Sequence, residues 1–325
     1  MRAVEEIIGE RKAGRLRSGP GLTEFCEYLA GKPARQEPEV FLPPEELAAE
    51  FRRFFCLPTP VRPCLEALCK RLGIVLTPHG NGADPDAAVA FDEEKQRWEL
   101  YVRFDAGPRQ SLSVFQELYK VIWSECRQRS ARWRYEGIAT MMQRRASQEF
   151  AFAVVLPPET LVSQAMACGL NPWSLATRFM TSPGACAHRL LRHLHLPFPY
   201  FQAHLNFRPD TPLQSHLFFA EQGVRAEVWR KGVKRAIGES RDAWPEMEAL
   251  ARRFPRRGQI LEAEGLLFES IRSGTSRRTT TDRLAGIVLP GPVSVVMRPN
   301  GTAQSQLFVQ VVPERYGPIL WEEQM

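Results

Sequence analysis

The sequence predicts an α+β fold, in which a mostly helical N-terminal part precedes a β-rich C-terminal part. Apolar residues recur at helical spacing through much of residues 43–195, whereas short alternating runs separated by turn residues dominate from residue 197 onward. The chain has 325 residues, of which 44% are hydrophobic and 25% charged. This composition is that of a globular protein, and the length is sufficient for two or three cores.

The net charge and the cysteines indicate which partners and which cellular compartment suit the chain. The net charge of +6 at neutral pH is spread along the chain, mainly as arginine, and indicates an acidic partner without specifying nucleic acid. No apolar run approaches the roughly 18 residues that cross a bilayer, and charged residues follow Met1 too soon for a signal peptide. We therefore expect no membrane contact. The seven cysteines are odd in number and scattered, which favours reduced thiols and a cytoplasmic location.

The first part of the chain is predicted to be a helical extension and linker over residues 1–42, because the prolines at 33 and 38 interrupt a short apolar segment. A helix is expected over residues 43–55, where prolines start it and glutamates occupy its first turn. A second helix over residues 64–72 ends at Gly73. A strand then leaves that helix over residues 74–77.

The next stretch combines strands with the central helix. Two strands are predicted over residues 87–92 and 98–104, joined by a charged turn. The central helix covers residues 111–123, with a buried apolar face built from Leu112, Phe115, Leu118, Tyr119 and Ile122. A basic, exposed segment over residues 127–134 and a helix over residues 135–156 complete an α+β domain that we place at residues 43–158.

Residues 159–196 form the third predicted part. A helix that ends at Phe179 is followed by Ser182, an apt N-cap residue, with Pro183 at the first position of the next helix. Two short helices joined by a tight turn have helix-turn-helix geometry.

The last part, residues 197–325, is predicted to be a mixed α/β domain that is rich in strands. Alternating runs indicate strands at residues 201–207, 284–289, 293–297 and 306–312, and residues 243–254 are expected to be helical.

The central helix carries the most informative motif. Gln116-Glu117-Leu118-Tyr119-Lys120 becomes H-E-x-x-H when histidines replace its first and last residues. In H-E-x-x-H two imidazoles one helical turn apart hold Zn²⁺ and the glutamate serves as general base. Glutamine and lysine are not usual zinc ligands. The motif therefore indicates either an ordinary helix or a metallopeptidase helix without its metal.

Four other stretches keep a recognisable order around this helix. Ala67-Leu-Cys-Lys-Arg-Leu-Gly-Ile74 leads into the first strand, and Arg109-Gln110 precede the central helix. Gln148-Glu-Phe-Ala-Phe-Ala-Val-Val-Leu-Pro157 ends the next long helix, and Leu175-Ala-Thr-Arg-Phe179 opens the helix-turn-helix. In this order and spacing, residues 43 to about 195 resemble the ImmA/IrrE family of zinc metallopeptidases. The three-part layout is similar to that of the IrrE branch, whose last part is GAF-like.

The resemblance implies a zincin-like domain whose metal site has been lost. The family's metal ligands fall on Gln116, Lys120 and Arg144, and its general base falls on Glu117. An ammonium and a guanidinium offer no lone pair to a cation, so we expect no metal and no cofactor. Without zinc, Glu117 has no activated water to deprotonate and is a vestigial base. On an unrelated helix, Gln116 and Lys120 would face solvent. In the family register, Lys120 and Arg144 could instead pair with Glu117.

The resemblance also implies a partner. The family acts on helix-turn-helix repressors in stress or mobile-element control, so this chain is predicted to be a non-catalytic member that binds such a repressor or another regulator.

Two alternatives stay open. One is a DNA-binding transcriptional regulator that uses its own helix-turn-helix and the basic segment, with contacts from five arginines: Arg178, Arg189, Arg192, Arg129 and Arg132. The other is an active metallopeptidase with a non-standard site. A further group, Cys186, His188, His193 and His195, matches no standard ligand spacing and is expected to be a surface or hinge cluster.

Overall fold

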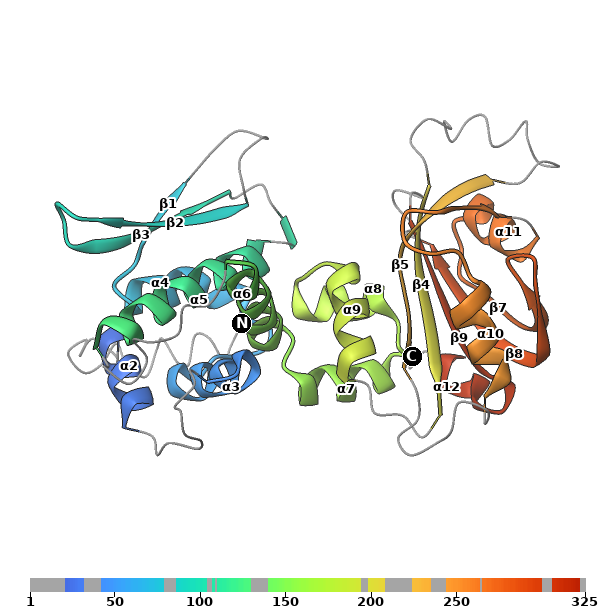
Figure 1. Ribbon diagram of the computed structural model, residues 1–325, viewed down its shortest axis with the longest axis horizontal. Helices are drawn as coiled ribbons and strands as arrows, with labels where there is room; N and C mark the ends of the chain where they lie inside the picture. Colours follow the sequence, from blue (N-terminus) through green and yellow to red (C-terminus); the bar gives the residue numbers. More distant parts are fainter. Residues whose placement is uncertain are drawn as a thin grey trace. The chain divides into compact units, whose positions relative to one another are not determined.

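The computed structural model of the chain describes residues 21–31, 42–78, 86–103, 107–108, 110–129, 140–193, 198–207, 224–234, 244–263, 265–299 and 306–321. Its helices and two sheets form a mixed α+β structure, as the sequence predicts (Figure 1). They divide into two compact units. Unit 1 comprises Met1–Pro157 and Arg178–Ser182, and unit 2 comprises Pro158–Thr177 and Pro183–Met325.

Unit 1 contains helices on a small sheet. The helices are α2 (Leu22–Ala30), α3 (Pro44–Phe55), the 3-10 turn η1 (Arg62–Cys64), α4 (Leu65–Arg71), α5 (Gln110–Arg129) and α6 (Thr140–Val155). The strands are β1 (Val75–Pro78), β2 (Ala87–Asp92) and β3 (Arg97–Val102), in the order β1-β3-β2. Strand β1 is parallel to β3, and β2 is antiparallel to β3. The strands lie within two residues of their predicted bounds, whereas α5 extends six residues beyond the predicted end at residue 123 and the helix predicted over residues 64–72 is preceded by the turn η1.

Helix α5 lies at the centre of unit 1, where it packs against α6, α2 and the strands β2 and β3. The core around it is aromatic. Phe51 of α3 has its ring centroid 5.4 Å from that of Phe25, 6.2 Å from that of Phe115 and 5.6 Å from that of Phe150. Because one ring touches three helices, this cluster holds α2, α5 and α6 against α3.

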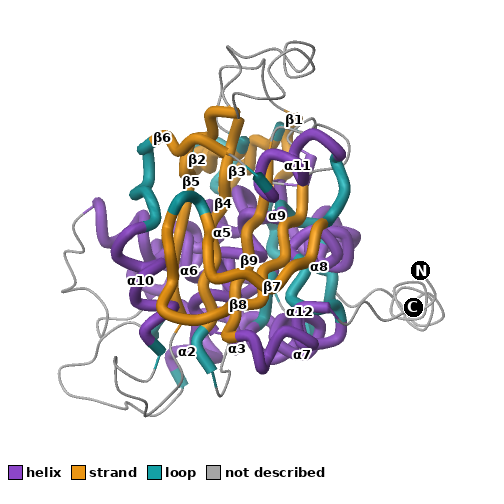
Figure 2. Tube along the Cα trace, turned by 90° about the vertical axis from the view of Figure 1, so that its right-hand side faces the viewer, coloured by secondary structure: helices purple, strands orange, loops and turns teal. Residues whose placement is uncertain are grey.

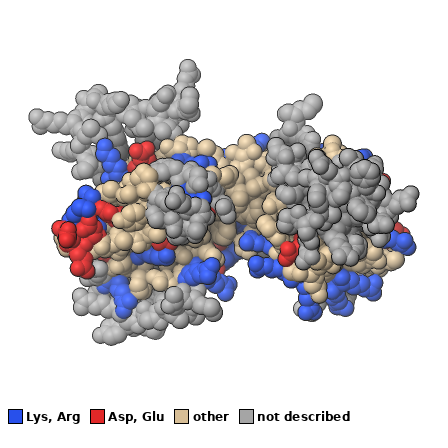
Figure 3. Space-filling model, turned by 90° about the horizontal axis from the view of Figure 1, so that it is seen from above, with Lys and Arg blue, Asp and Glu red and all other residues tan. Residues whose placement is uncertain are grey.

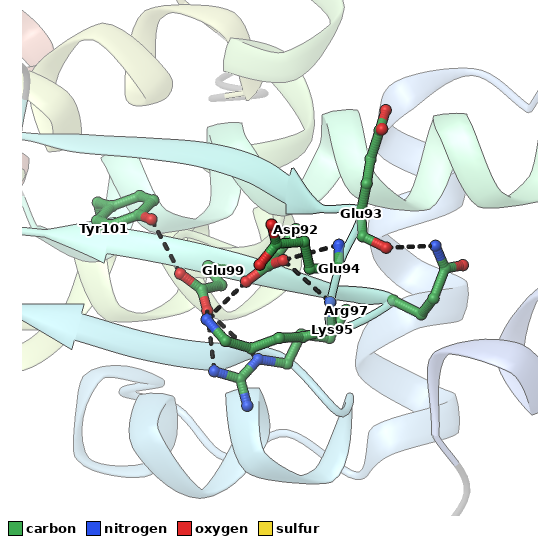
Figure 4. Close-up of polar contacts among 8 residues, drawn as sticks. Asp92, Glu93, Glu94, Lys95, Arg97, Glu99 and Tyr101 are labelled. Atoms are coloured by element: carbon green, nitrogen blue, oxygen red, sulfur yellow. Dashed lines mark hydrogen bonds and ion pairs between the residues drawn. The ribbon is translucent and has the colours of Figure 1, made fainter.

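The turn between β2 and β3 is held by its own charged side chains (Figure 4). The backbone N–H groups of Glu94 and Lys95 donate to Asp92 Oδ1 at 3.1 and 3.0 Å, and Lys95 Nζ donates to Asp92 Oδ2 at 2.7 Å. Arg97 donates to Glu99 at 2.9 Å. The bond from Lys95 lowers the pKa of Asp92, and the bond from Arg97 lowers the pKa of Glu99. These contacts stabilise a hairpin turn and account for the charges there.

Unit 2 is built on a six-stranded antiparallel sheet (Figure 2). Helices α7 (Pro158–Ala167), α8 (Pro172–Phe179) and α9 (Pro183–His193) precede it. The strands are β4 (Tyr200–Phe207), β5 (Val224–Lys234), β6 (Ile260–Ala263), β7 (Arg277–Leu284), β8 (Ile287–Pro299) and β9 (Gln306–Pro313), in the order β6-β5-β4-β9-β8-β7. The remaining elements are α10 (Pro245–Arg253), α11 (Leu266–Ser273), η6 (Glu314–Tyr316) and α12 (Gly317–Trp321).

The two faces of this sheet differ in chemistry because successive residues of a strand point to opposite sides. One face is apolar: Ala203 and Leu205 of β4 join Met247 and Leu250 of α10 in a single buried cluster. The other face carries buried polar residues such as Gln202, His204, Arg298 and Gln310 beside apolar ones such as Phe308, and it is contacted by α9, the turn between α7 and α8, and α12.

Helix α9 lies on this polar face, across β4 and β5. A Cβ atom built on Gly184 would lie 3.7 Å from the His204 ring, and one built on Gly232 would lie 2.8 Å from Leu191 Cδ1. Glycine at 232 therefore lets the helix approach β5 closely. The helix-turn-helix segment, expected as a separate part over residues 159–196, lies mostly within unit 2.

Some predicted elements differ from the structure. The run at residues 284–289 was expected to be one strand, but a turn at Ala285 and Gly286, with φ of +50° and +73°, separates β7 from β8 there. The basic segment expected from residue 127 continues α5 as far as Arg129, and its remainder lies outside the described residues. Strands β5, β6 and β7 and helix α11 were not predicted: β5 and β7 are rich in charged and polar residues, and β6 and α11 are too short to show a clear period.

Within the described ranges no single helix has the length and apolarity that crossing a membrane requires, while the bent pair Gln143–Val155 and Pro158–Ala167 meets the same length and composition criteria together.

Candidate functional site

The motif of helix α5, Gln116–Lys120, runs from the core of unit 1 to its surface. Phe115, Leu118 and Tyr119 are buried in the core of unit 1. Gln116 is half-buried, Glu117 is 9% exposed, and Lys120 is exposed. The motif therefore lies at the border of the core, where a carboxylate keeps limited access to solvent.

Glu117 and Lys120 form an ion pair one helical turn apart. Lys120 Nζ donates to Glu117 Oε1 at 2.6 Å, and the Lys120 side chain is 45% exposed while that of Glu117 is 12% exposed. The carboxylate accepts a charge-assisted hydrogen bond at short range. A cation thus already lies beside the glutamate that the resemblance identifies as the general base.

Arg144 does not take part in this pair. It is exposed on α6, and among the described residues its guanidinium makes no hydrogen bond or ion pair, although its backbone carbonyl accepts the Ser147 hydroxyl at 2.9 Å. The neighbouring Arg145 is paired with Glu149 at 3.1 Å. The predicted pairing with Glu117 is therefore found for Lys120 and not for Arg144.

The donor groups suited to a metal are scattered. Within the part of the chain that the structure describes, no three of its His, Cys, Asp and Glu residues come together in a group that could hold an ion. In the group of Cys186, His188, His193 and His195, Cys186 is buried and His188 is exposed, so these two side chains face different surroundings. His195 lies outside the described residues.

The five arginines proposed for partner or nucleic-acid contact have different environments. Arg178 and Arg192 are exposed. Arg189 is 1% exposed and so is not available on the surface. Arg129 lies in the last turn of α5, and Arg132 lies outside the described residues.

Helix α9 is poorly placed to read a DNA groove. It begins at Pro183, as the sequence predicts, but its buried residues include Ala185, Cys186 and Leu190 as well as Arg189. In a helix-turn-helix protein the recognition helix presents a polar face to the bases. The exposed side chains of α9 are instead few, with His188 and Arg192 one turn apart.

No family model matches the chain, and no curated protein matches it either. A solved structure to which the chain shows a distant likeness is described as a Mycobacterium tuberculosis transcriptional regulator. It is 14% identical, with a TM-score of 0.44, over 87% of this chain and 92% of that one.

A buried polar network in unit 2 was not anticipated from the sequence. Arg298, which is 1% exposed, donates from Nε to Gln310 Oε1 at 2.9 Å and from Nη2 to the carbonyls of Gly169 at 3.0 Å and Leu320 at 2.9 Å. Gln310 Nε2 donates to the carbonyl of Leu170 at 2.8 Å. One guanidinium therefore joins β8, β9, α12 and the turn between α7 and α8. The available signal was an arginine and a glutamine within otherwise apolar strands.

His204 is a second buried polar residue on the same face. Its ring stacks on Phe308 with centroids 4.2 Å apart, and it meets Trp229 edge-on at 5.4 Å. Burial lowers the pKa of His204 to about 4, although a hydrogen bond with the Gln306 side chain acts in the opposite direction. The imidazole is neutral at pH 7, and it belongs to the packing between β4, β5 and β9.

Proposed function

We propose that the chain is a regulatory protein whose unit 1 is a zincin-like, catalytically degenerate ImmA/IrrE-type domain. It binds a helix-turn-helix repressor or another regulator in stress or mobile-element control, in the cytoplasm, without cleaving it. The C-terminal part is proposed to be GAF-like and sensory. The observation that carries the proposal is the ion pair between Lys120 and Glu117.

The physical reason lies in the charge at the former ligand positions. Zinc ligands donate lone pairs, and the ammonium of Lys120 has none to donate. Bound 2.6 Å from Glu117, it also neutralises the carboxylate that would act on a metal-bound water. Arg144 adds a second cation at the third ligand position. A dication placed among these groups would be repelled.

The order of elements in unit 1 supports the family register. A helix, a strand, two further strands, the motif helix α5 and a second long helix α6 follow one another as the resemblance implies. Helices α5 and α6 also pack together, so the third ligand position lies on the helix next to the motif. This agreement of order supports placing Gln116, Lys120 and Arg144 at the ligand positions.

Restoring the ligands tests the register directly. In the variant Gln116→His/Lys120→His/Arg144→Glu, two imidazoles and a carboxylate return to the ligand positions, and we expect one zinc per chain after purification without chelators. The matched control is Gln116→His/Lys120→His/Arg145→Glu, which moves the carboxylate by one residue and should bind zinc much more weakly. Metal content is measured by mass spectrometry of the purified proteins.

The outcomes separate the alternatives. Equal zinc in the restored variant and the control would show that the register is wrong. Stoichiometric zinc in the unaltered protein would favour an active metallopeptidase with a non-standard site. For the partner, the unaltered protein and a purified helix-turn-helix repressor should form a complex in which the repressor stays intact, whereas cleavage would contradict a non-catalytic role.

Direct DNA reading through the helix-turn-helix receives less support. Arg189 was one of its expected contacts, and its burial removes it from the surface. The exposed Arg178 and Arg192 could contact phosphates, which fix position without reading sequence.

A further inference from the structure

A basic surface with an exposed tryptophan forms in unit 2 where α9, β5 and the turn after α10 come together. We define the basic surface by His188, Arg192, Trp229, Arg230 and Arg257, all of them exposed. Its members come from three separate stretches of sequence, so no run of basic residues in the chain marks it.

Side-chain packing and backbone hydrogen bonds bring these stretches together. Helix α9 reaches β5 through Leu191 and Gly232, as described above. The turn at residues 256–259 is bonded to β5 on its other side: the Val228 N–H donates to the Gln259 carbonyl at 3.0 Å, and the Gly258 N–H donates to the Val228 carbonyl at 2.8 Å. Arg257 is thereby held close to Arg230.

A β-bulge presents the tryptophan. Val228 is opposite Leu205 and Arg230 is opposite His204, so Trp229 is the extra residue on β5. A bulge of this kind redirects a side chain out of the regular alternation. Trp229 is 41% exposed, and one edge of it rests against His204. The indole ring therefore contacts the protein along one edge and keeps part of its surface accessible to solvent.

The charges of the basic surface repel one another. Partial desolvation by neighbouring side chains, followed by the positive charges of Arg230, Arg192 and Arg189, lowers the pKa of His188. Partial desolvation, followed by the charge of Arg257, lowers the pKa of Arg230. Among the described residues, no carboxylate forms an ion pair with Arg230 or Arg257. A bound polyanion would relieve this repulsion. Lys and Arg also gather on the face of unit 2 drawn in Figure 3, where few acidic side chains are visible.

The combination of cations and an aromatic ring favours one class of polyanion. Arginines bind phosphates, and an exposed aromatic ring stacks with a base whose face is free. Bases in a duplex keep their faces covered, whereas those of a single strand do not. We propose that the basic surface of unit 2 binds single-stranded nucleic acid, with phosphates on Arg192, Arg230 and Arg257 and a base stacked on Trp229. This site is independent of the metal-ligand register in unit 1.

The test measures binding of the full chain to a fluorescein-labelled oligothymidine by anisotropy, over a series of salt concentrations. Three phosphate contacts to a single strand predict a slope of log K against log salt near −2, at about −0.7 per contact. Trp229→Ala should weaken binding roughly tenfold through the lost stacking, whereas Trp229→Phe should retain most of it. Arg230→Gln/Arg257→Gln should weaken binding and reduce the slope by about 1.4.

The matched control is Arg277→Gln/Arg278→Gln, which removes two exposed arginines from β7, at the opposite edge of the sheet from β6. Strand β7 lies four strands from β5, or roughly 20 Å along the sheet, so this variant should leave the affinity and the salt slope unchanged. Equal weakening by the control would overturn the proposal, since charge alone would then explain binding. So would the absence of binding at low salt.

Two further ligands test which class of polyanion the basic surface binds. A duplex of the same length should bind more weakly than oligothymidine, and Trp229→Ala should not affect it. The contrary result is that polyglutamate of equal charge binds as tightly as oligothymidine, with both affinities unchanged by Trp229→Ala. In that case the surface recognises acidic protein and the nucleic-acid proposal fails. Far-UV circular dichroism of each variant establishes that the fold is retained.

Discussion

At the scale of single residues, Lys120 is the most direct test of the metal-free site proposed for α5. A histidine there would offer a lone pair, whereas lysine offers an ammonium that is bound to Glu117 at 2.6 Å. The pair lies at the border of the core, so its contribution to stability is expected to be modest and sensitive to salt. A substitution of the lysine therefore tests the contact without unfolding the helix.

We expect Lys120→Met to lower the free energy of unfolding by about 0.5–1 kcal/mol, because it leaves the shielded Glu117 carboxylate without its cation. Urea unfolding at low and high salt measures the change, which should shrink in high salt. The control is Arg145→Met, which breaks the pair with Glu149 on α6, where the arginine side chain is 81% exposed. A loss in the control as large as that in Lys120→Met would contradict the special position of Lys120.

His204 predicts a dependence of stability on pH. Its pKa is lowered to about 4 in the folded protein, whereas an unfolded histidine titrates near 6.5. Because the folded pKa lies below the unfolded one, the unfolded state takes up the proton first. Stability is therefore complete above pH 6.5 and is lost as pH falls toward 4, by about 3 kcal/mol at most. In His204→Gln, unfolding free energies should decline less over this range, with a residual decline from His188. An unchanged pH profile would contradict this assignment.

At the scale of elements, the sequence predicts those helices and strands that are determined by residues within one continuous segment. Helix α5 and its motif residues follow from spacing within one continuous segment, and so does the start of α9 at Pro183. The network around Arg298 could not be predicted in the same way, because Gln310 and Gly169 reach it only through strand pairing and tertiary packing. Likewise, the bulge that presents Trp229 depends on the register between β4 and β5.

The Arg298 network should be the main polar support of the helices on the sheet of unit 2. Arg298→Leu leaves the carbonyls of Gly169 and Leu320 without their donor, so we expect unit 2 to lose about 3–5 kcal/mol of stability. Urea unfolding followed by near-UV circular dichroism measures the loss. Arg283→Leu, at an exposed position on β7, is the control and should change stability by less than about 0.5 kcal/mol. Equal effects would show that the network adds nothing beyond surface charge.

At the scale of the whole molecule, the chain carries two cores of different character. Unit 1 is centred on aromatic rings from four helices, and unit 2 on aliphatic residues between its sheet and α10. Each proposed site belongs to one unit: the degenerate motif to unit 1 and the basic surface to unit 2. A mutation in the core of one unit should therefore leave the proposed site in the other unit intact.

Phe51→Ala tests this division. Phe51 is fully buried against Phe25, Phe115 and Phe150, so its truncation should destabilise unit 1 by about 3–5 kcal/mol. Hydrogen exchange followed by mass spectrometry should show protection lost from α5 and α6, while peptides from β9 keep theirs, because locally cooperative units open separately. Binding of oligothymidine to the basic surface should persist in this variant. If β9 loses protection by the same factor as α5, the chain unfolds as one cooperative unit and the two sites cannot be treated as independent.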